Sequence, residues 1–183
     1  GGAVVNSVGL LGTSGGRGKG HVVAGGLLRL SGRARVDGDA RFGPTGRLEM
    51  IGSPSVSGET GPLSSPVAPA GIDLARLAAE LGVANDNARI PTTSFGRSPL
   101  TGTAGRTLVV GDGDRLELPE GTYLLDGLDL DGSAVVTVKG RVRILVLGPV
   151  RLAGRSRLNP EAGAFRLRLW STGSDFAVEG DAS

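Results

Sequence analysis

The feature that most constrains this chain is a ladder of short strand-like segments that fills residues 116–178. Apolar and polar residues alternate within each segment, and Gly, Asp or Ser closes nearly every one. Alternation with a period of two places the apolar side chains on one face of a strand. No helical pattern separates the segments, so the ladder predicts strands that stack directly on other strands.

Apolar positions in this ladder repeat at steps of about twenty residues, which is typical of a solenoid whose every coil is one structural repeat. We therefore predict an all-β fold, a parallel β-solenoid with ~20–22 residues per coil. The expected columns are Leu125, Leu147 and Leu169; Leu130 and Leu152; and Leu116, Val136, Leu158 and Val178.

A second rhythm, with a step of six residues, runs through residues 27–50. Arginines precede three of the apolar positions, so aliphatic and cationic side chains should lie on opposite faces. A six-residue step is typical of one flat side of a β-helix coil, with Gly32 and Gly38 at the corners. The apolar positions are Leu30, Val36, Phe42 and Leu48, and the arginines are Arg29, Arg35 and Arg41. We assign residues 1–51 to a glycine-rich start and the first coils.

Residues 52–106 interrupt the ladder. Prolines lack a backbone donor, so residues 52–72 (Pro54, Pro62, Pro66 and Pro69) are expected to leave the solenoid wall. A short helix is expected at 73–82, with Asp73 as N-cap, Gly82 at C′, and one apolar stripe. The stripe comprises Leu74, Leu77, Ala78 and Leu81. Both parities are apolar in residues 142–147, which predicts that the helix covers the outside of that strand.

A polar loop should follow the helix, and residues 107–183 should form the main coils of what we expect to be one domain.

The amino-acid composition excludes several classes of function. Glycine makes up 33 of 183 residues, and aromatic residues only 3%, so the core must be aliphatic. The 20 basic residues face 18 acidic ones without a basic run, which argues against nucleic-acid binding. There is no cysteine for disulfides or thiolate metal sites. The sequence also contains no run of ~20 consecutive apolar residues, so it predicts no membrane-spanning segment.

Several short motifs, in their order along the chain, resemble one family. They are Ala84-Asn85-Asp86-Asn87, Ile90-Pro91 and Pro99 to Gly102; then Leu118-Pro119-x-Gly121-Thr122-Tyr123 and Gly127-Leu128-x-Leu130-x-Gly132; and finally Val138-x-Gly140-x-Val142 and Leu158-Asn159-Pro160. Together they resemble the β-solenoid domain of unknown function in bacterial PilX-like pilus-assembly and prepilin-like envelope proteins. The resemblance covers roughly residues 72–183. The hexads of residues 27–50 also resemble the rhythm of bactofilins.

This resemblance implies a right-handed parallel β-helix displayed on or outside the bacterial cell envelope, with no established catalytic residues to carry over. Family members usually have a hydrophobic N-terminus and further C-terminal coils. Neither stands in this sequence, so we expect a piece of a longer protein.

Two acidic pairs are candidate metal ligands. Asp112 and Asp114, with Asp129 and Asp131, could bind calcium as glycine/aspartate turns do. The alternative is that Asp-Gly pairs only form turns. A polysaccharide lyase would instead bring these acids together with Arg141 or Arg143. We expect no cofactor, with calcium as the exception to test.

Two further groups are candidates for binding. Asn85, Asp86 and Asn87 form either a ligand loop or a structural loop. Outward arginines could grip an anionic polymer, although cations on exposed strands also protect against aggregation. These arginines are Arg141, Arg143, Arg151, Arg166 and Arg168.

The sequence thus favours a non-catalytic structural or adhesive solenoid of a bacterial envelope or extracellular appendage. Its partners would be further copies of itself or other envelope or pilus proteins, with an anionic polysaccharide as a further candidate. The C-terminal coil, if uncovered, would offer an edge for end-to-end stacking into filaments. The alternative is a carbohydrate-binding or lyase-like β-helix protein.

Overall fold

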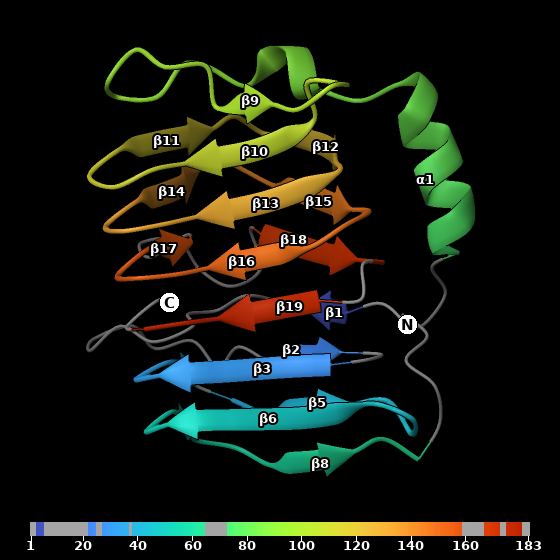
Figure 1. Ribbon diagram of the computed structural model, residues 1–183. Coiled ribbons are helices and arrows are strands. Elements are labelled where there is room, and N and C mark those ends of the chain that lie inside the picture. The colour runs from blue at the N-terminus through green and yellow to red at the C-terminus, as the bar shows by residue number, and fades with distance from the viewer. Residues whose placement is uncertain are drawn as a thin grey trace.

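The computed structural model describes residues 3–5, 22–24, 27–36, 38–64, 73–158, 167–172 and 175–180. It confirms the predicted parallel β-solenoid, with one α-helix on its side among these residues (Figure 1). The described strands lie on three faces. The first face contains, in spatial order, β9 (Leu100–Thr101), β10 (Thr107–Val110), β13 (Gly127–Leu130), β16 (Val150–Leu152), β19 (Asp175–Val178), β3 (Leu27–Gly32) and β6 (Arg47–Gly52).

The second face consists of two separate sheets. One contains β11 (Arg115–Leu118), β14 (Val135–Val138) and β17 (Arg157–Leu158); the other contains β4 (Arg35–Val36) and β7 (Ser55–Val56). The third face contains, in order, β12 (Gly121–Leu125), β15 (Val142–Val146), β18 (Leu167–Ser171), β1 (Ala3–Val5), β2 (Val22–Ala24), β5 (Ala40–Phe42) and β8 (Thr60–Pro62). The helices are α1 (Leu74–Val83) and the 3₁₀ turn η1 (Asn87–Arg89).

The two ends of the described chain meet in the middle of the solenoid. Strand β19 pairs in parallel with β16 on one side and with β3 on the other. The N-terminal coils therefore continue the stack below the C-terminal coil, as Figure 1 shows by the blue strands under the red ones. On the third face, β1 lies antiparallel between β18 and β2. The condition for end-to-end stacking through the C-terminal coil, an uncovered edge, is not met, because β3 occupies that edge.

Glycines mark this continuity at one corner of the coils. Gly132, Gly154, Gly180, Gly32 and Gly52 all have positive φ, between 62° and 89°. A Cβ on Gly154 would lie 2.6 Å from the carbonyl oxygen of Gly132, and one on Gly32 would lie 2.8 Å from the Cα of Gly180. The backbones stack too closely for a side chain, and they do so across the junction of the two chain ends in the same way as elsewhere.

The first half of the proline-rich stretch also belongs to the solenoid. Ser55 and Val56 pair with Arg35 and Val36, and residues 60–62 pair with 40–42. We had expected residues 52–72 to leave the solenoid wall. For residues 52–64 this is wrong, because they form the rest of the last coil. Prolines fit there because the strands lie at the edge of their sheets, where a backbone donor can be missing without loss of a ladder bond.

Some predicted columns are confirmed and others are wrong. Leu130 faces Leu152, and Leu116, Val136 and Leu158 are aligned. Leu125 instead aligns with Val146, and Leu169 with Ile144, because the coils differ in length. Val178 aligns with Leu152 on another face. The core is a continuous aliphatic column along the axis, together with Tyr123 and Phe176.

Helix α1 covers the outside of the third face, as the apolar residues 142–147 predicted. Its Leu81 forms one cluster with Leu124, Leu145 and Trp170, all less than a tenth exposed. The side chain of Asp73 caps the helix by accepting hydrogen bonds from the Ala75 and Arg76 N–H groups, both at 3.0 Å. The expected C′ glycine is wrong, because Gly82 lies within the helix, which ends at Val83.

The pairing of β19 with β3 can be tested by a disulfide in this cysteine-free chain. Arg29 and Ala177 are register partners, so their Cα atoms should lie ~5 Å apart, within disulfide range. We expect Arg29→Cys with Ala177→Cys to form an intramolecular disulfide that raises the free energy of unfolding by about 3–5 kcal/mol.

The matched control is Ala177→Cys with Glu49→Cys, two coils apart at ~10 Å, which is too far for a disulfide. Thiol titration, mass spectrometry and denaturant unfolding would make the comparison. Free thiols in the Arg29/Ala177 variant would contradict the arrangement of the two chain ends.

Candidate functional site

The two ends of the solenoid differ, and this difference defines the candidate site. At one end, residues 84–106 lie over the coil formed by β10, β11 and β12 (Figure 1). Strand β9 runs antiparallel to β10, and the Val109 N–H donates to the Pro99 carbonyl at 2.8 Å. Ile90 and Leu100 pack on the aliphatic core. We call residues 84–106 the cap.

Over β12, side chains of the cap take the place of a neighbouring strand. Asn87 is buried; its amide donates to the Leu124 carbonyl at 2.6 Å and accepts from the Leu124 N–H at 3.1 Å. The Asp86 carboxylate accepts from the Thr122 N–H at 2.8 Å. Asn85 accepts from the Asn87 N–H and donates to the Leu81 carbonyl. The predicted polar loop thus binds the solenoid edge; whether it also binds a ligand stays a prediction.

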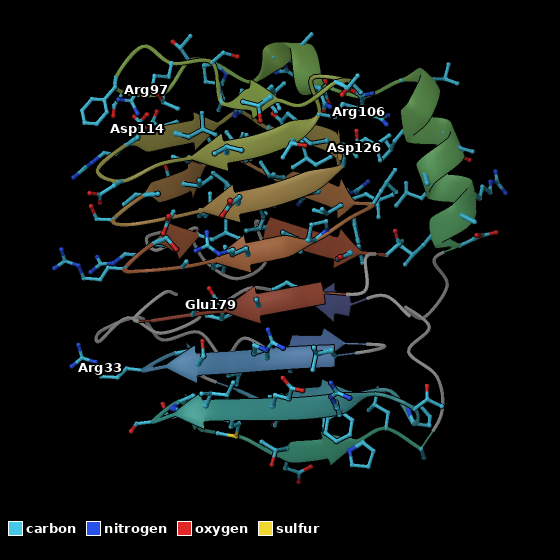
Figure 2. All side chains as sticks on the ribbon, in the orientation of Figure 1. Arg33, Arg97, Arg106, Asp114, Asp126 and Glu179 are labelled. Carbon is cyan, nitrogen blue, oxygen red and sulfur yellow. The ribbon has the colours of Figure 1, made fainter. Side chains whose placement is uncertain are left out.

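Over β11, the cap is held by Asp114, which is 1% exposed. Its Oδ1 accepts from the Ser94 hydroxyl at 2.8 Å and from the Phe95 and Arg115 N–H groups at 3.1 and 2.9 Å. Desolvation would raise the pKa of Asp114, but these bonds and one from Thr93 outweigh it and lower the pKa to about 2. Figure 2 shows Asp114 under the cap, near Arg97.

The opposite end, formed by β6, β7 and β8, has no such cover among the described residues. We call it the open end. In its last coil, the N–H groups of Ser53, Ser55 and Ser57 donate to the preceding coil at 2.8–2.9 Å. Successive residues of a strand point their backbone groups to opposite sides. The backbone N–H and C=O groups of Leu48, Met50 and Gly52 therefore point away from the solenoid, along the free edge of β6.

The interior of the solenoid is exposed at the open end. Leu48 and Met50 continue the columns of Leu28 and Leu30, whose side chains are 0% exposed. Met50, by contrast, is 48% exposed although it stands in a core position. The neighbouring Ile51, on the outer surface, is 56% exposed. The open end therefore combines an apolar surface with unpaired strand groups.

Two prolines restrict which strand of the open end can pair with another strand. The Leu63 N–H donates to the Phe42 carbonyl at 2.7 Å, so residue 62 points outward, and Pro62 has no N–H there. Pro54 likewise occupies an outward position beside β7. Proline at such positions is a common protection of strand edges. Among the described strands of the open end, taken with the residues directly beside them, β6 is the one in which every outward residue has a backbone N–H group.

The four candidate calcium ligands each bond within the protein. Asp112 accepts from the Ser133 N–H at 2.7 Å and hydroxyl at 2.8 Å, which lowers its pKa. Asp131 accepts from the Gly132 N–H, and Asp129 pairs with Arg151 at 3.0 Å. With Asp114 under the cap, no three acids or histidines among the described residues form a metal-binding group.

Nor does the structure bring these acids together with the expected lyase base. Asp129 lies in β13 of the first face, whereas Arg143 lies in β15 of the third face, and Arg141 directly precedes that strand. Asp129 and Arg143 therefore do not stand on one face, as a lyase site built on this pair would need. The lyase alternative itself stays a prediction.

The candidate arginines divide into two kinds. Arg151 lies among Asp129, Asp131 and Glu179, at 3.0, 3.9 and 3.3 Å. Arg143 and Arg168 are exposed register partners on neighbouring strands, and neither forms an ion pair with another described residue. Arg141 is exposed beside them. Arg166 lies outside the described residues.

The sequence did not indicate the open end. Met50 continues the alternation of residues 27–50, and nothing in that pattern distinguishes it from a core position. The prolines were taken as a break in the ladder. The signal that could have identified an edge strand was the combination of apolar alternation with prolines one coil later, at Pro54 and Pro62.

The chain matches no protein-family model, no curated protein and no solved structure. The resemblance of its motifs to PilX-like and bactofilin solenoids therefore stays a hypothesis. Among the described residues, no helix has the length and apolar character needed to cross a membrane.

The attachment of the cap should depend on pH. Because the pKa of Asp114 is about 2 in the folded chain and ~3.9 in an unfolded one, its ionised form stabilises the fold above pH ~4. This contribution is lost as the pH falls through the folded pKa. We expect the protection of the Phe95 and Arg115 amides, which is the exchange rate relative to the intrinsic rate at the same pH, to fall between pH ~4 and ~2.

Asp114→Asn should lower the protection of these amides at neutral pH and remove most of the acid dependence of that protection. Glu117→Gln, on an exposed face, is the control and should leave both unchanged. Equal protection of Phe95 in wild type and Asp114→Asn at pH 7 would show that Asp114 does not hold the cap.

Proposed function

We propose that this chain is a non-catalytic structural module of a bacterial envelope or extracellular appendage, which associates with a second copy of itself through the open end. The observation that carries this proposal is the exposure of Met50 in a core column, at one end of a solenoid whose other end is covered on three faces. The placement in an envelope rests on the resemblance of residues 72–183, and subcellular fractionation would test that part.

The two ends of the solenoid support a structural role because the cap covers one of them, whereas the other is uncovered among the described residues. A solenoid coil leaves strand groups and core side chains uncovered wherever the stack stops. At the cap, buried polar groups such as Asn87 and Asp114 satisfy the strand edges. At the open end, Leu48, Met50 and Val56 are only partly covered. Burial of such side chains against a partner removes apolar surface from water, which favours association.

We expect the chain to form dimers in a concentration-dependent manner, measured by light scattering or sedimentation. Met50→Lys should weaken this association at least about tenfold, because a charge must then be desolvated at the contact. The fold itself should persist, since the Met50 side chain is already 48% exposed.

Val83→Lys is the matched control, because Val83 is an exposed apolar residue, 92% accessible, on the far side of the molecule at the end of α1. It adds the same charge and should not change the association. A chain that stays monomeric up to its solubility limit would overturn the proposed function.

A second candidate function is favoured by Arg143 and Arg168. Their register places two guanidinium groups side by side, ~4.8 Å apart at the backbone, without a described acidic partner. An anion between them would relieve the repulsion of like charges and accept several hydrogen bonds. Such a pair would suit the repeating charges of an anionic polysaccharide and would make the module adhesive.

Dextran sulfate is a suitable probe of this surface. The double variant Arg143→Gln/Arg168→Gln should bind it several-fold more weakly and with a smaller salt dependence. Arg106→Gln/Arg151→Gln is the control with equal net charge, because both arginines already pair with acids; Figure 2 shows Arg106 beside Asp126. Equal loss in the two double variants would point to net charge alone and reject a specific surface.

A further inference from the structure

We propose that two copies join head to head at the open end, with β6 of one copy antiparallel to β6 of the other around a two-fold axis through Met50. This inference rests on the proposed function and adds the partner geometry. Its product is a closed dimer and not a filament.

The cap disfavours the head-to-tail arrangement that a filament would need. In that arrangement, β6 of one copy would pair with β10 of the next. The outer edge of β10 is already paired with β9, through the registers Thr107–Thr101 and Leu108–Leu100. The outer edge of β12 is occupied by Asp86 and Asn87. Among the described residues, the first face of the capped end therefore offers only the two-residue strand β9 as an edge, whereas a second open end offers the full length of β6. An interface between identical surfaces is two-fold symmetric.

The pattern of outward groups selects the register. In an antiparallel pair, residues whose N–H and C=O groups point to the partner must face each other. The outward residues of β6 are Leu48, Met50 and Gly52. A two-fold axis through Met50 sets Met50 opposite Met50 of the second copy, and Leu48 opposite Gly52. It is the one two-fold register that pairs all three outward residues within β6.

Charge supports the same register. An axis through Glu49 would place Glu49 opposite Glu49 of the second copy, and like charges in directly opposed positions are unfavourable. With the axis through Met50, Glu49 faces Ile51 and keeps its ion pairs with Arg29 and Arg47, at 3.0 and 2.9 Å. No two like charges of β6 then face each other.

The two core columns meet in this arrangement. Residues directly opposed across antiparallel strands point their side chains to the same side of the sheet. Because Met50 stands in a core column, the Met50 side chains of both copies would lie against each other on the common axis. The same rotation brings β7 of one copy toward β8 of the other, where Pro54 and Pro62 lack outward donors. The β6 pair therefore carries the strand hydrogen bonds of the dimer.

A single cysteine tests the register, because the chain contains none of its own. Directly opposed residues of a hydrogen-bonded antiparallel pair have Cα atoms ~5.5 Å apart, within disulfide range. The full chain with Met50→Cys should form a covalent dimer under mild oxidation, and reduction should reverse it. Ile51→Cys is the neighbouring control, as its counterpart would lie diagonally and across a wider separation. Val83→Cys is the distant control, on α1.

Each outcome separates the inference from the proposed function. Rapid cross-linking of Met50→Cys, with slow cross-linking of both controls and discrete dimers in electron micrographs, is the expected result. If the unmodified chain dimerises but Ile51→Cys cross-links as fast as Met50→Cys, the register is wrong and association at the open end stands. Filaments would overturn the two-fold arrangement. A chain that is monomeric by light scattering would overturn the proposed function, and this inference with it.

Discussion

The structure depends on the pairing of each coil with the next. A coil of about twenty residues cannot bury its aliphatic side chains or satisfy its strand edges alone, so every coil requires a neighbour on both sides. The described residues meet this requirement in two ways and leave it unmet at one end. Coils stack on coils through the middle, the cap replaces a coil at one end, and the other end presents Met50 and the edge of β6 uncovered. Where the stack stops thus decides which surface is available to a partner.

The position of the chain ends follows from the same requirement. Strand β19 would leave an edge and a core column uncovered if the stack ended with it. Leu27 to Leu30 cover both, in register with 175–178. The corner glycines Gly180 and Gly32 approach as closely as Gly154 and Gly132 do within the continuous part. The outer coils of the described stack are thus formed by residues 47–62 and 107–125, which come from the interior of the sequence. Helix α1 lies along the side of the stack (Figure 1).

The sequence predicted what local alternation encodes. The solenoid class, the cover on the outside of residues 142–147 and the Asp73 cap were each predicted from a pattern within a short stretch of sequence. The column of Leu125, Leu147 and Leu169 was wrong, because Leu125 aligns with Val146: a period averaged over the ladder conceals coils of unequal length. The pairing of β19 with β3 could not be predicted, since no periodicity connects residues 175–178 to 27–30. The role of Asn87 could not be predicted either, because the sequence does not distinguish an asparagine whose amide pairs with a strand edge from one in a solvent-exposed loop.

Polar side chains and prolines solve the same problem at the two ends of this solenoid, with different consequences. At the cap, Asn87 and Asp86 supply the missing partners of β12, which costs the burial of polar groups but closes that edge completely. At the open end, Pro54 and Pro62 remove backbone donors but supply no partners for the remaining groups. Those two strand edges therefore have fewer groups to pair with another strand, but they stay uncovered. The outward edge of β6 lacks such a proline. In the proposed dimer, the two faces that carry these prolines add no strand hydrogen bonds, and β6 is the strand of the open end whose outward groups pair with the second copy.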